Sequence, residues 1–264
     1  MKSSWREVCV LLALDAGNTN ITIGVFESSK LVHNWRLRTV REQTADELGV
    51  LLRNLFQLAS LEVKAVEGII VASVVPTINA SLAMMSQRYF NTEAVFVTHE
   101  TNTGLKICYD DPREVGADRL VDAVAALKKY GAPCIVVDLG TAITFNVVSA
   151  NAEYLGGIIA AGIGISIDAL YERTARLPRV DFREPEKLVG TTTVGSLQSG
   201  LYYGALGLID GVIDRLLDEF GPATKIVATG GQARLIARGS RRLKIIDENL
   251  TLEGLEMIWS RGRR

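Results

Sequence analysis

The stretch from Leu12 to Phe26 reads LALDAGNTNITIGVF, and the prediction of the fold starts from it. Apolar residues alternate with other residues on both sides of a central D-x-G-N-T turn, which predicts strands over Val8–Asp15 and Thr22–Phe26. Similar alternation predicts a third strand over Lys30–Arg38. The chain therefore opens with a meander of strands.

A second stretch, Val136–Val148, reads VVDLGTAITFNVV and repeats this pattern. Nearly half of the chain separates the two copies, so the repeat predicts two related halves that face each other across a cleft, where ligands usually bind. We expect the boundary before Asp118, which gives domains 1–117 and 118–264. The alignment superposes three pairs of residues, namely Asp15 and Asp138, Gly17 and Gly140, and Asn18 and Thr141.

Strands followed by alternating helices and strands indicate an α/β fold with mixed sheets. The spacing of apolar residues predicts helices over residues 44–58, 77–89, 120–127, 166–173 and 193–220. The further predicted strands cover residues 68–72, 94–97, 135–138, 143–148, 154–160 and 225–228.

Composition and charge exclude several classes of protein. The 264 residues are 48% hydrophobic and 22% charged, which describes a chain that buries a large core rather than a disordered one. The formal net charge is −1, whereas nucleic-acid binders usually carry an excess of basic residues, so we expect no nucleic-acid partner. Short basic clusters around Arg241 and Arg264 are typical of solvated surface.

Cysteines and apolar runs point to a cytoplasmic protein. Three cysteines without C-x-x-C spacing fit neither a disulfide framework nor a thiolate zinc site, and they indicate a reducing compartment. The run Val8–Leu14 ends at Asp15 and continues into alternation, so it predicts a strand rather than a signal peptide. The apolar stretch Leu155–Ile167 is too short to cross a membrane. We therefore expect no membrane association.

Histidine is scarce. Only His33 and His99 occur, and neither lies near a serine or cysteine motif, which disfavours a Ser/His/Asp hydrolase and an H-E-x-x-H zinc site. We therefore expect a carboxylate to carry any acid or base chemistry.

The two D-x-G turns have the residues of a phosphate and metal site. Glycine lets the backbone approach a ligand, Asn and Thr supply hydrogen bonds, and an Asp at a strand end can hold a cation. One such turn is equally typical of an ordinary hairpin, whereas two equivalent copies favour the ligand site. The sequence has neither a P-loop nor a G-x-G-x-x-G fingerprint.

Two further segments allow two interpretations each. Gly116-Ala117-Asp118-Arg119 precedes a helix, where Asp can be a cap and Arg a solvated side chain, or the two can act as a base and a carboxylate clamp. Tyr109, upstream, could line the same pocket. Residues 228–233, ATGGQA, could accommodate adenine or ribose, or could only pack a strand on a helix.

The motifs LDAGNTN, GADR, VVDLGTAIT, GGIIAAGI, TTTVGSLQSG and VATGGQA resemble type III pantothenate kinase, of the acetate and sugar kinase/Hsp70/actin superfamily. The resemblance runs from about Leu12 to about Trp259. It implies ATP-dependent phosphorylation of pantothenate to 4'-phosphopantothenate, the first step of coenzyme A biosynthesis. It also implies two ribonuclease-H-like (actin-like ATPase) domains and a homodimer that needs K⁺ or NH₄⁺.

The resemblance also assigns roles to residues. Asp118 would be the general base, Asp138 would bind the monovalent cation, and Asp15 would help to place Mg²⁺ on the phosphates. Thr193 would reach pantothenate bound to the neighbouring subunit. The ATP-binding residues would be Asp15, Ala16, Gly17, Asn18, Thr19, Asn20, Ile21, Thr22 and Thr141. The pantothenate-binding residues would be Tyr109, Gly116, Ala117, Asp118, Arg119 and Thr193.

The sequence departs from the family pattern at two residues, and two alternative functions remain. Ala161 stands where the family commonly has Pro, and Thr192 stands where it commonly has Asn. Other kinases and phosphatases of the superfamily are one rival, which the GADR motif disfavours. A nucleotide-binding accessory protein is the other, which the intact aspartates disfavour. The predicted helix over residues 193–220 is a candidate for the subunit interface, although core packing explains its apolar positions equally well.

Overall fold

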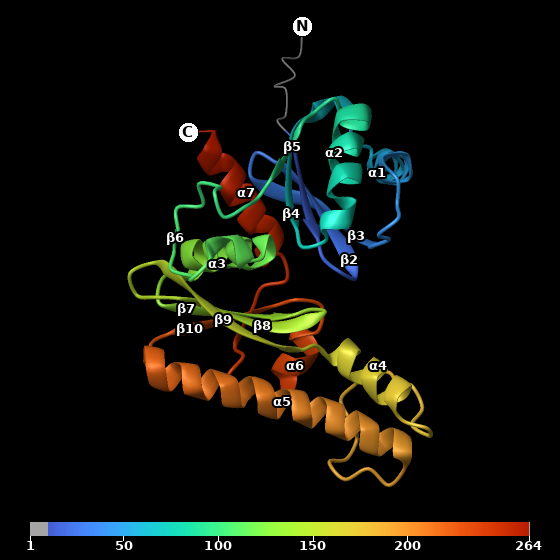
Figure 1. The fold of residues 1–264 in the computed structure, drawn as a ribbon, viewed down its shortest axis with the longest axis vertical. Helices are drawn as coiled ribbons and strands as arrows, with labels where there is room; N and C mark the ends of the chain where they lie inside the picture. The colour runs from blue at the N-terminus through green and yellow to red at the C-terminus, as the bar shows by residue number, and fades with distance from the viewer. Residues whose placement is uncertain (1–9, 264) are drawn as a thin grey trace, which may run out of the picture. The chain divides into compact units, whose positions relative to one another are not determined.

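The computed structural model describes residues 10–263. Val8 and Cys9 of the first predicted strand, the preceding residues 1–7, and Arg264 lie outside the described residues. The chain forms two compact units, labelled by element in Figure 1. Unit 1 contains described residues 10–104, 110–125 and 251–263, and unit 2 contains residues 105–109 and 126–250.

Unit 1 is built on a five-stranded mixed sheet in the order β3-β2-β1-β4-β5. β1 pairs antiparallel with β2 and parallel with β4, because the chain turns tightly after β1 but returns to it through a helix. The strands are β1 (Val10–Ala16), β2 (Asn20–Glu27), β3 (Lys30–Arg38), β4 (Val66–Ser73) and β5 (Ala94–Phe96).

Helices cover both faces of this sheet. On one face, α1 (Ala45–Leu58) and α2 (Pro76–Phe90) pack over the even-numbered residues of β1, such as Leu12 and Leu14. Thr44 begins α1 with a capping box, since its side chain accepts from Glu47 N while the Glu47 carboxylate accepts from Thr44 N.

On the other face of the unit 1 sheet lies α7 (Leu250–Gly262). Its residues Leu252 and Trp259 fill the space above Gly24 and Gly68, where a Cβ atom would collide with them. The central strands β1 and β4 are therefore buried on both faces, as expected for parallel neighbours.

Unit 2 repeats the arrangement with a six-stranded sheet in the order β11-β10-β7-β8-β9-β6. β7 pairs antiparallel with β8 and parallel with β10, as β1 pairs with β2 and β4 in unit 1. Within the described part of the chain, β6 alone has no counterpart in unit 1, and it lies on the outer edge of β9. The strands are β6 (Lys106–Ile107), β7 (Cys134–Leu139), β8 (Ala142–Val148), β9 (Glu153–Ala161), β10 (Lys225–Thr229) and β11 (Ile245–Ile246).

The unit 2 core lies between this sheet and its helices. Ile135, Val137 and Leu139 of β7 pack with Tyr202 and Ile209 of α5, and all five side chains are buried. The helices are α4 (Ile163–Arg173), α5 (Thr193–Phe220) and α6 (Ala233–Gly239), while α3 (Ala117–Tyr130) begins in unit 1 and ends in unit 2.

The two sheets confirm the predicted pair of related halves and the α/β class. Both meanders, and the predicted helices and strands on the described residues, occur with small shifts at their ends. The division into domains 1–117 and 118–264 stays a prediction. The sequence analysis predicted a helix after residues 228–233, where α6 lies, but it did not predict β6, β11 or α7, nor the short 3₁₀ helices over Val63–Ala65 and Pro112–Glu114.

Among residues 10–263, no helix is long and apolar enough to span a bilayer.

Candidate active site

The first D-x-G turn, in unit 1, links the end of β1 to the start of β2. Gly17 N donates to Asn20 O over 3.0 Å, and a Cβ atom on Gly17 would lie 3.3 Å from that oxygen. Thr39 holds the turn from outside, since its hydroxyl donates to Gly17 O over 2.6 Å and its N–H donates to Thr19 O over 2.9 Å. Thr39 was not predicted as a site residue from the sequence. It follows β3, and only the folding of the meander brings it next to the turn.

Exposure divides the predicted ATP-binding residues of this turn. Asn18 and Thr19 are exposed. Ala16 and Ile21 are at most 2% exposed and belong to the core, so only their main-chain atoms can contact ATP. The half-buried residues of the segment are Asp15, Gly17, Asn20 and Thr22.

The second turn, in unit 2, has the same construction. Asp138 stands near the end of β7, opposite Thr144 of β8 and beside Thr229 of β10. Gly140 N donates to Ala142 O over 3.1 Å, and Thr141 at the tip is exposed. A half-buried carboxylate at a strand end and an exposed hydroxyl are therefore held on one tight turn.

Glycines make the space that the Asp138 carboxylate occupies. A Cβ atom on Gly140 would lie 3.3 Å from Asp138 Oδ2, and one on Gly230 would collide with Oδ1 and with the main chain of Leu139. Gly230 also has a φ of +91°, which glycine adopts without strain. Residues 228–233 therefore pack closely against the second turn, and both of their predicted roles stay predictions.

The GADR segment, in unit 1, begins helix α3. Leu120 N donates to Gly116 O over 3.2 Å, which places Asp118 in the first helical turn. Asp118 Oδ1 accepts from Arg119 N over 2.7 Å, and a Cβ atom on Gly116 would lie 2.6 Å from the same oxygen. Gly116 therefore leaves room for the carboxylate to fold back over the start of the helix.

Burial raises the pKa of the Asp118 carboxyl, and the hydrogen bond and positive charge of Arg119 only partly oppose this shift. A carboxylate with a raised pKa is a stronger base, as a proton acceptor should be. Arg119 itself is 7% exposed. The interpretation of Arg119 as a solvated side chain is therefore wrong.

Tyr109 and Thr193 both belong to unit 2. Tyr109 is half-buried after β6, with its ring centroid 6.5 Å from that of Tyr154. Thr193 is exposed as the first residue of α5, and Thr192 before it accepts a hydrogen bond from Gly195 N over 3.1 Å. Threonine at position 192 thus caps the helix, a role that asparagine also performs.

The predicted site residues are divided between the two units. Unit 1 carries residues 15–22 and 116–119, and unit 2 carries Tyr109, Asp138, Thr141 and Thr193. Among the described residues, no group of three or more His, Cys, Asp and Glu side chains could hold a metal ion.

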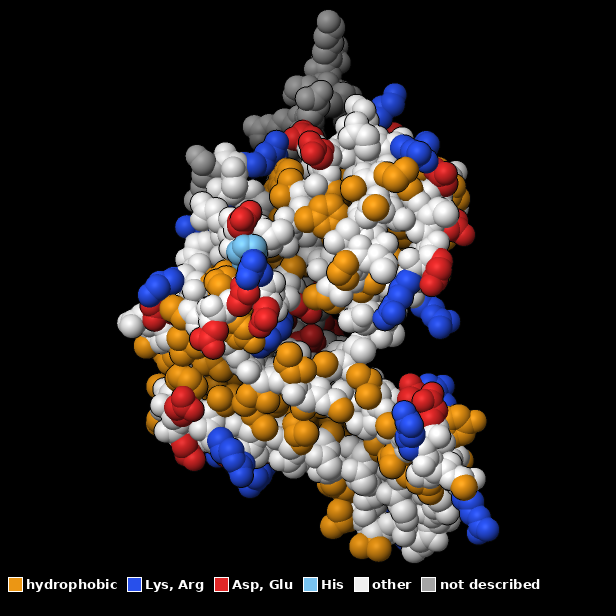
Figure 2. Space-filling model, viewed as in Figure 1, with side chains coloured by type: hydrophobic (Ala, Val, Ile, Leu, Met, Phe, Trp, Pro, Cys, Tyr) orange, Lys and Arg blue, Asp and Glu red, His pale blue; other side chains and the backbone are white. Residues whose placement is uncertain are grey.

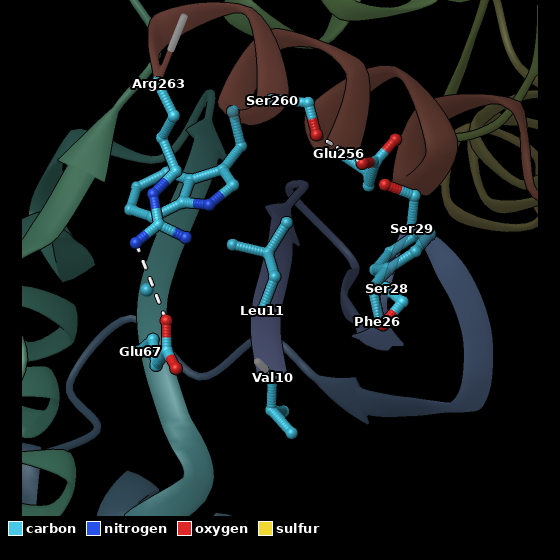
Figure 3. Close-up of a pocket in the computed structure, with 11 residues that line it drawn as sticks. Val10, Leu11, Phe26, Ser28, Ser29, Glu67, Glu256, Ser260 and Arg263 are labelled. Carbon is cyan, nitrogen blue, oxygen red and sulfur yellow. Dashed lines mark hydrogen bonds and ion pairs between the residues drawn. The ribbon is translucent and has the colours of Figure 1, made fainter. Parts of the chain in front are cut away.

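A surface pocket of about 250 Å³ lies within unit 1 (Figure 3). Trp259 and Arg263 line it, with the Arg263 guanidinium 5.5 Å from the indole ring and 3.6 Å from the Glu67 carboxylate. Val10 and Leu11 line it at the beginning of β1. Asp15 is about 16 Å further along the strand at ~3.3 Å per residue. This pocket is thus separate from the first turn.

Solved structures with this fold cover nearly the whole chain. A Campylobacter jejuni protein assigned to the Baf family of transcriptional activators matches with a TM-score of 0.56 at 21% identity, over 96% of this chain and 98% of its own. A Listeria monocytogenes protein assigned as an N-acetylmannosamine kinase matches with a TM-score of 0.53 at 14% identity, over 97% and 100%. The fold is that of the actin-like ATPases, with two ribonuclease-H-like domains.

Closer relatives define the family. The family model described as type III pantothenate kinase matches residues 11–215. A type III pantothenate kinase of Solibacter usitatus is 63% identical over 96% of this chain and 97% of its own, and one of Koribacter versatilis is 53% identical over 96% of each. This chain belongs to the type III pantothenate kinase family, which confirms the resemblance stated from its motifs.

Proposed function

We propose that this protein transfers the γ-phosphoryl group of ATP to the primary hydroxyl of pantothenate, the first step of coenzyme A biosynthesis, with Asp118 as the general base. Family membership over nearly the full chain supports the reaction. The observation that carries the role of Asp118 is its folded-back carboxylate at the start of α3, whose pKa is raised by burial. We also expect the reaction to take place in the cytoplasm, where ATP is available.

In this proposal the Asp118 carboxylate accepts the proton of the pantothenate hydroxyl as its oxygen attacks the γ-phosphorus. The bond from that phosphorus to the bridging oxygen of ADP breaks, and ADP leaves. The proton then passes from Asp118 to solvent. Arg119 would bind the pantothenate carboxylate, since a guanidinium pairs with a carboxylate through two parallel hydrogen bonds, and Gly116, Ala117 and Tyr109 would complete that site.

Residues 15–22 and Thr141 would bind the phosphates of ATP. The exposed Asn18, Thr19 and Thr141 supply side-chain donors, and the turns supply main-chain N–H groups. Phosphoryl transfer depends mostly on positioning the reactants and on neutralising the phosphate charge. Turns of this kind, together with bound cations and one carboxylate base, are therefore sufficient for the reaction.

Two cations would assist the phosphoryl transfer. Mg²⁺ is commonly held by one or two carboxylates together with substrate phosphates, which fits the single carboxylate of Asp15 beside the first turn. Asp138, with Gly140 and Gly230 close to its carboxylate, offers one negative charge, which fits a singly charged cation such as K⁺ or NH₄⁺. When bound, these ions would neutralise phosphate charge.

A homodimer would complete the site through Thr193. Unit 2 exposes large apolar side chains on β9, on α4 and around the start of α5, and Figure 2 shows such side chains over β9. Exposed apolar groups of this kind mark interaction surfaces. The six most exposed, between 42% and 77%, are Ile159, Ile165, Tyr171, Leu188, Val189 and Val194.

The reaction is tested by coupled release of ADP from Mg-ATP with and without pantothenate, in K⁺ and in Na⁺. We expect release that requires pantothenate and is faster in K⁺. Release from folded protein that ignores pantothenate would contradict the proposal.

A further inference from the structure

The short segment that contains Tyr109 belongs to unit 2. Residues 105–109 belong to unit 2, although the chain before and after them belongs to unit 1. Its two-residue strand β6 pairs with Glu153 and Tyr154 of β9, at one edge of the sheet (Figure 1). Cys108 N donates to Tyr154 O over 2.8 Å, and Lys106 Nζ lies 2.7 Å from Glu153 Oε1. These contacts join the main chain beside Tyr109 to the edge of the unit 2 sheet.

At the same place β9 contains a bulge. Val148 pairs with Tyr154 and Val147 pairs with Gly156, so Leu155 is an extra residue on β9. Gly156 has a φ of +116°, a conformation that other L-residues rarely adopt. The bulge thus bends β9 at a residue without a side chain.

The Tyr109 ring lies against this bare backbone. A Cβ atom on Gly156 would be 3.0 Å from Cε2 and 3.2 Å from Cδ2 of Tyr109, closer than carbon atoms normally approach. Tyr154 flanks the ring, with an angle of 37° between the two ring planes. A side chain at position 156 would therefore require the Tyr109 ring to shift by a few tenths of an ångström.

From this contact we propose that Gly156 is a positioning residue, which sets the place of the Tyr109 ring and through it the binding of pantothenate. The inference rests on the proposed function, in which Tyr109 lines the pantothenate site. Gly156 touches Tyr109 and needs no contact with substrate to act. Its influence should therefore appear in the KM for pantothenate and not in the KM for ATP.

The test is a double-mutant cycle of Gly156→Ala and Tyr109→Ala, with the KM for each substrate measured by ADP release. In the wild-type background, Gly156→Ala should raise the KM for pantothenate roughly fivefold, because a displacement well below 1 Å costs less than the about 10²-fold of a full ångström. In the Tyr109→Ala background the same substitution should change that KM little, since the ring is gone.

Gly221→Ala is the matched control for backbone strain. Gly221 also has a positive φ, +91°, but nothing lies within 4 Å of the position of its Cβ. Gly221→Ala should lower the melting temperature, as Gly156→Ala should, and leave the KM for pantothenate unchanged.

Each other outcome overturns the inference. If Gly156→Ala raises the KM for pantothenate by the same factor in both backgrounds, Gly156 does not act through Tyr109, although the proposed function stands. If Tyr109→Ala leaves the KM unchanged, the role of Tyr109 in the proposed function fails as well. If Gly156→Ala does not fold, the double variant Gly156→Ala/Tyr109→Ala should fold, because it removes the collision with the ring. If the double variant does not fold either, the defect comes from backbone strain at position 156 alone.

Discussion

Asp15 and Asp138 hold equivalent places in two sheets of the same topology. Asp15 pairs with Thr22 across the meander and with Ala72 on the parallel side, and Asp138 pairs with Thr144 and Thr229 in the same way. In each strand the neighbouring residues point into the main core, so both carboxylates are on the opposite face of their sheet. This equivalence supports two ligand-binding turns of common design.

Asp118→Asn should lower kcat about 10²-fold or more, because the amide cannot accept the hydroxyl proton. The KM values should change much less than kcat. Asp110→Asn is the control, since Asp110 is an exposed carboxylate in the same unit. Steady-state ADP release measures both variants, and near-normal turnover of Asp118→Asn would contradict the assignment.

Asp118 should also affect stability in a pH-dependent way. Burial raises its pKa, so the folded state binds a proton more tightly than the unfolded state, and wild-type stability falls as pH rises through the raised pKa. The Asp118→Asn variant has no carboxyl group at this position, so it does not lose stability in this way as pH rises. Its melting temperature should therefore exceed that of the wild type at neutral pH, and the difference should shrink on acidification below the ordinary pKa of Asp. A constant difference across pH would contradict this reasoning.

Arg119→Ala should raise the KM for pantothenate much more than the KM for ATP, because it removes the bidentate partner of a carboxylate. The arginine is buried, so some stability should be lost too. Arg113→Ala, at an exposed arginine paired with Asp111, is the control and should leave both KM values unchanged. An equal rise of both KM values in Arg119→Ala would argue against a carboxylate clamp.

Thr39→Val should weaken ATP binding without touching the ligand. It removes the 2.6 Å hydrogen bond to Gly17 O that holds the first turn. A loss of about 1 kcal/mol corresponds to a roughly fivefold higher KM for ATP. Thr92→Val, which removes hydroxyl hydrogen bonds elsewhere in unit 1, is the control. If both variants behave alike, Thr39 has only a structural role.

Asp138→Asn should abolish the stimulation by K⁺ while keeping the shape of the second turn. The amide preserves the contacts with Gly140 and Gly230 but removes the negative charge that would attract a cation. ADP release is compared in K⁺ and Na⁺, with Asp168→Asn, a half-exposed carboxylate paired with Arg179, as the control. Undiminished K⁺ stimulation of Asp138→Asn would place the cation elsewhere.

Long periodic elements were predictable from sequence. β3 over Lys30–Arg38 and α5 over Thr193–Phe220 occur with the predicted bounds, because alternation or helical spacing runs through their whole length. The two-residue β6 has no period of its own, and only its pairing with β9 defines it. For α7 a signal existed, since Leu252, Leu255 and Ile258 recur at helical spacing and are buried.

The site was predictable in its motifs but not in its contacts. The turn residues and GADR follow from local sequence, whereas the contact of Gly230 with Asp138 arises from parallel pairing of β10 with β7, strands far apart in the chain. The support of the first turn by Thr39 and the burial of Arg119 also depend on tertiary packing. No local pattern could show these three features.

Mass spectrometry of the product tests the proposed reaction and the role of Asp118 together. The wild type and Asp118→Asn are incubated in parallel with Mg-ATP, K⁺ and pantothenate. We predict that the wild type forms 4'-phosphopantothenate in equal amount to ADP, and that the rate of the variant is lower by about 10²-fold or more. ADP without phosphopantothenate, or equal rates for the two proteins, would contradict the proposed reaction or the role of Asp118.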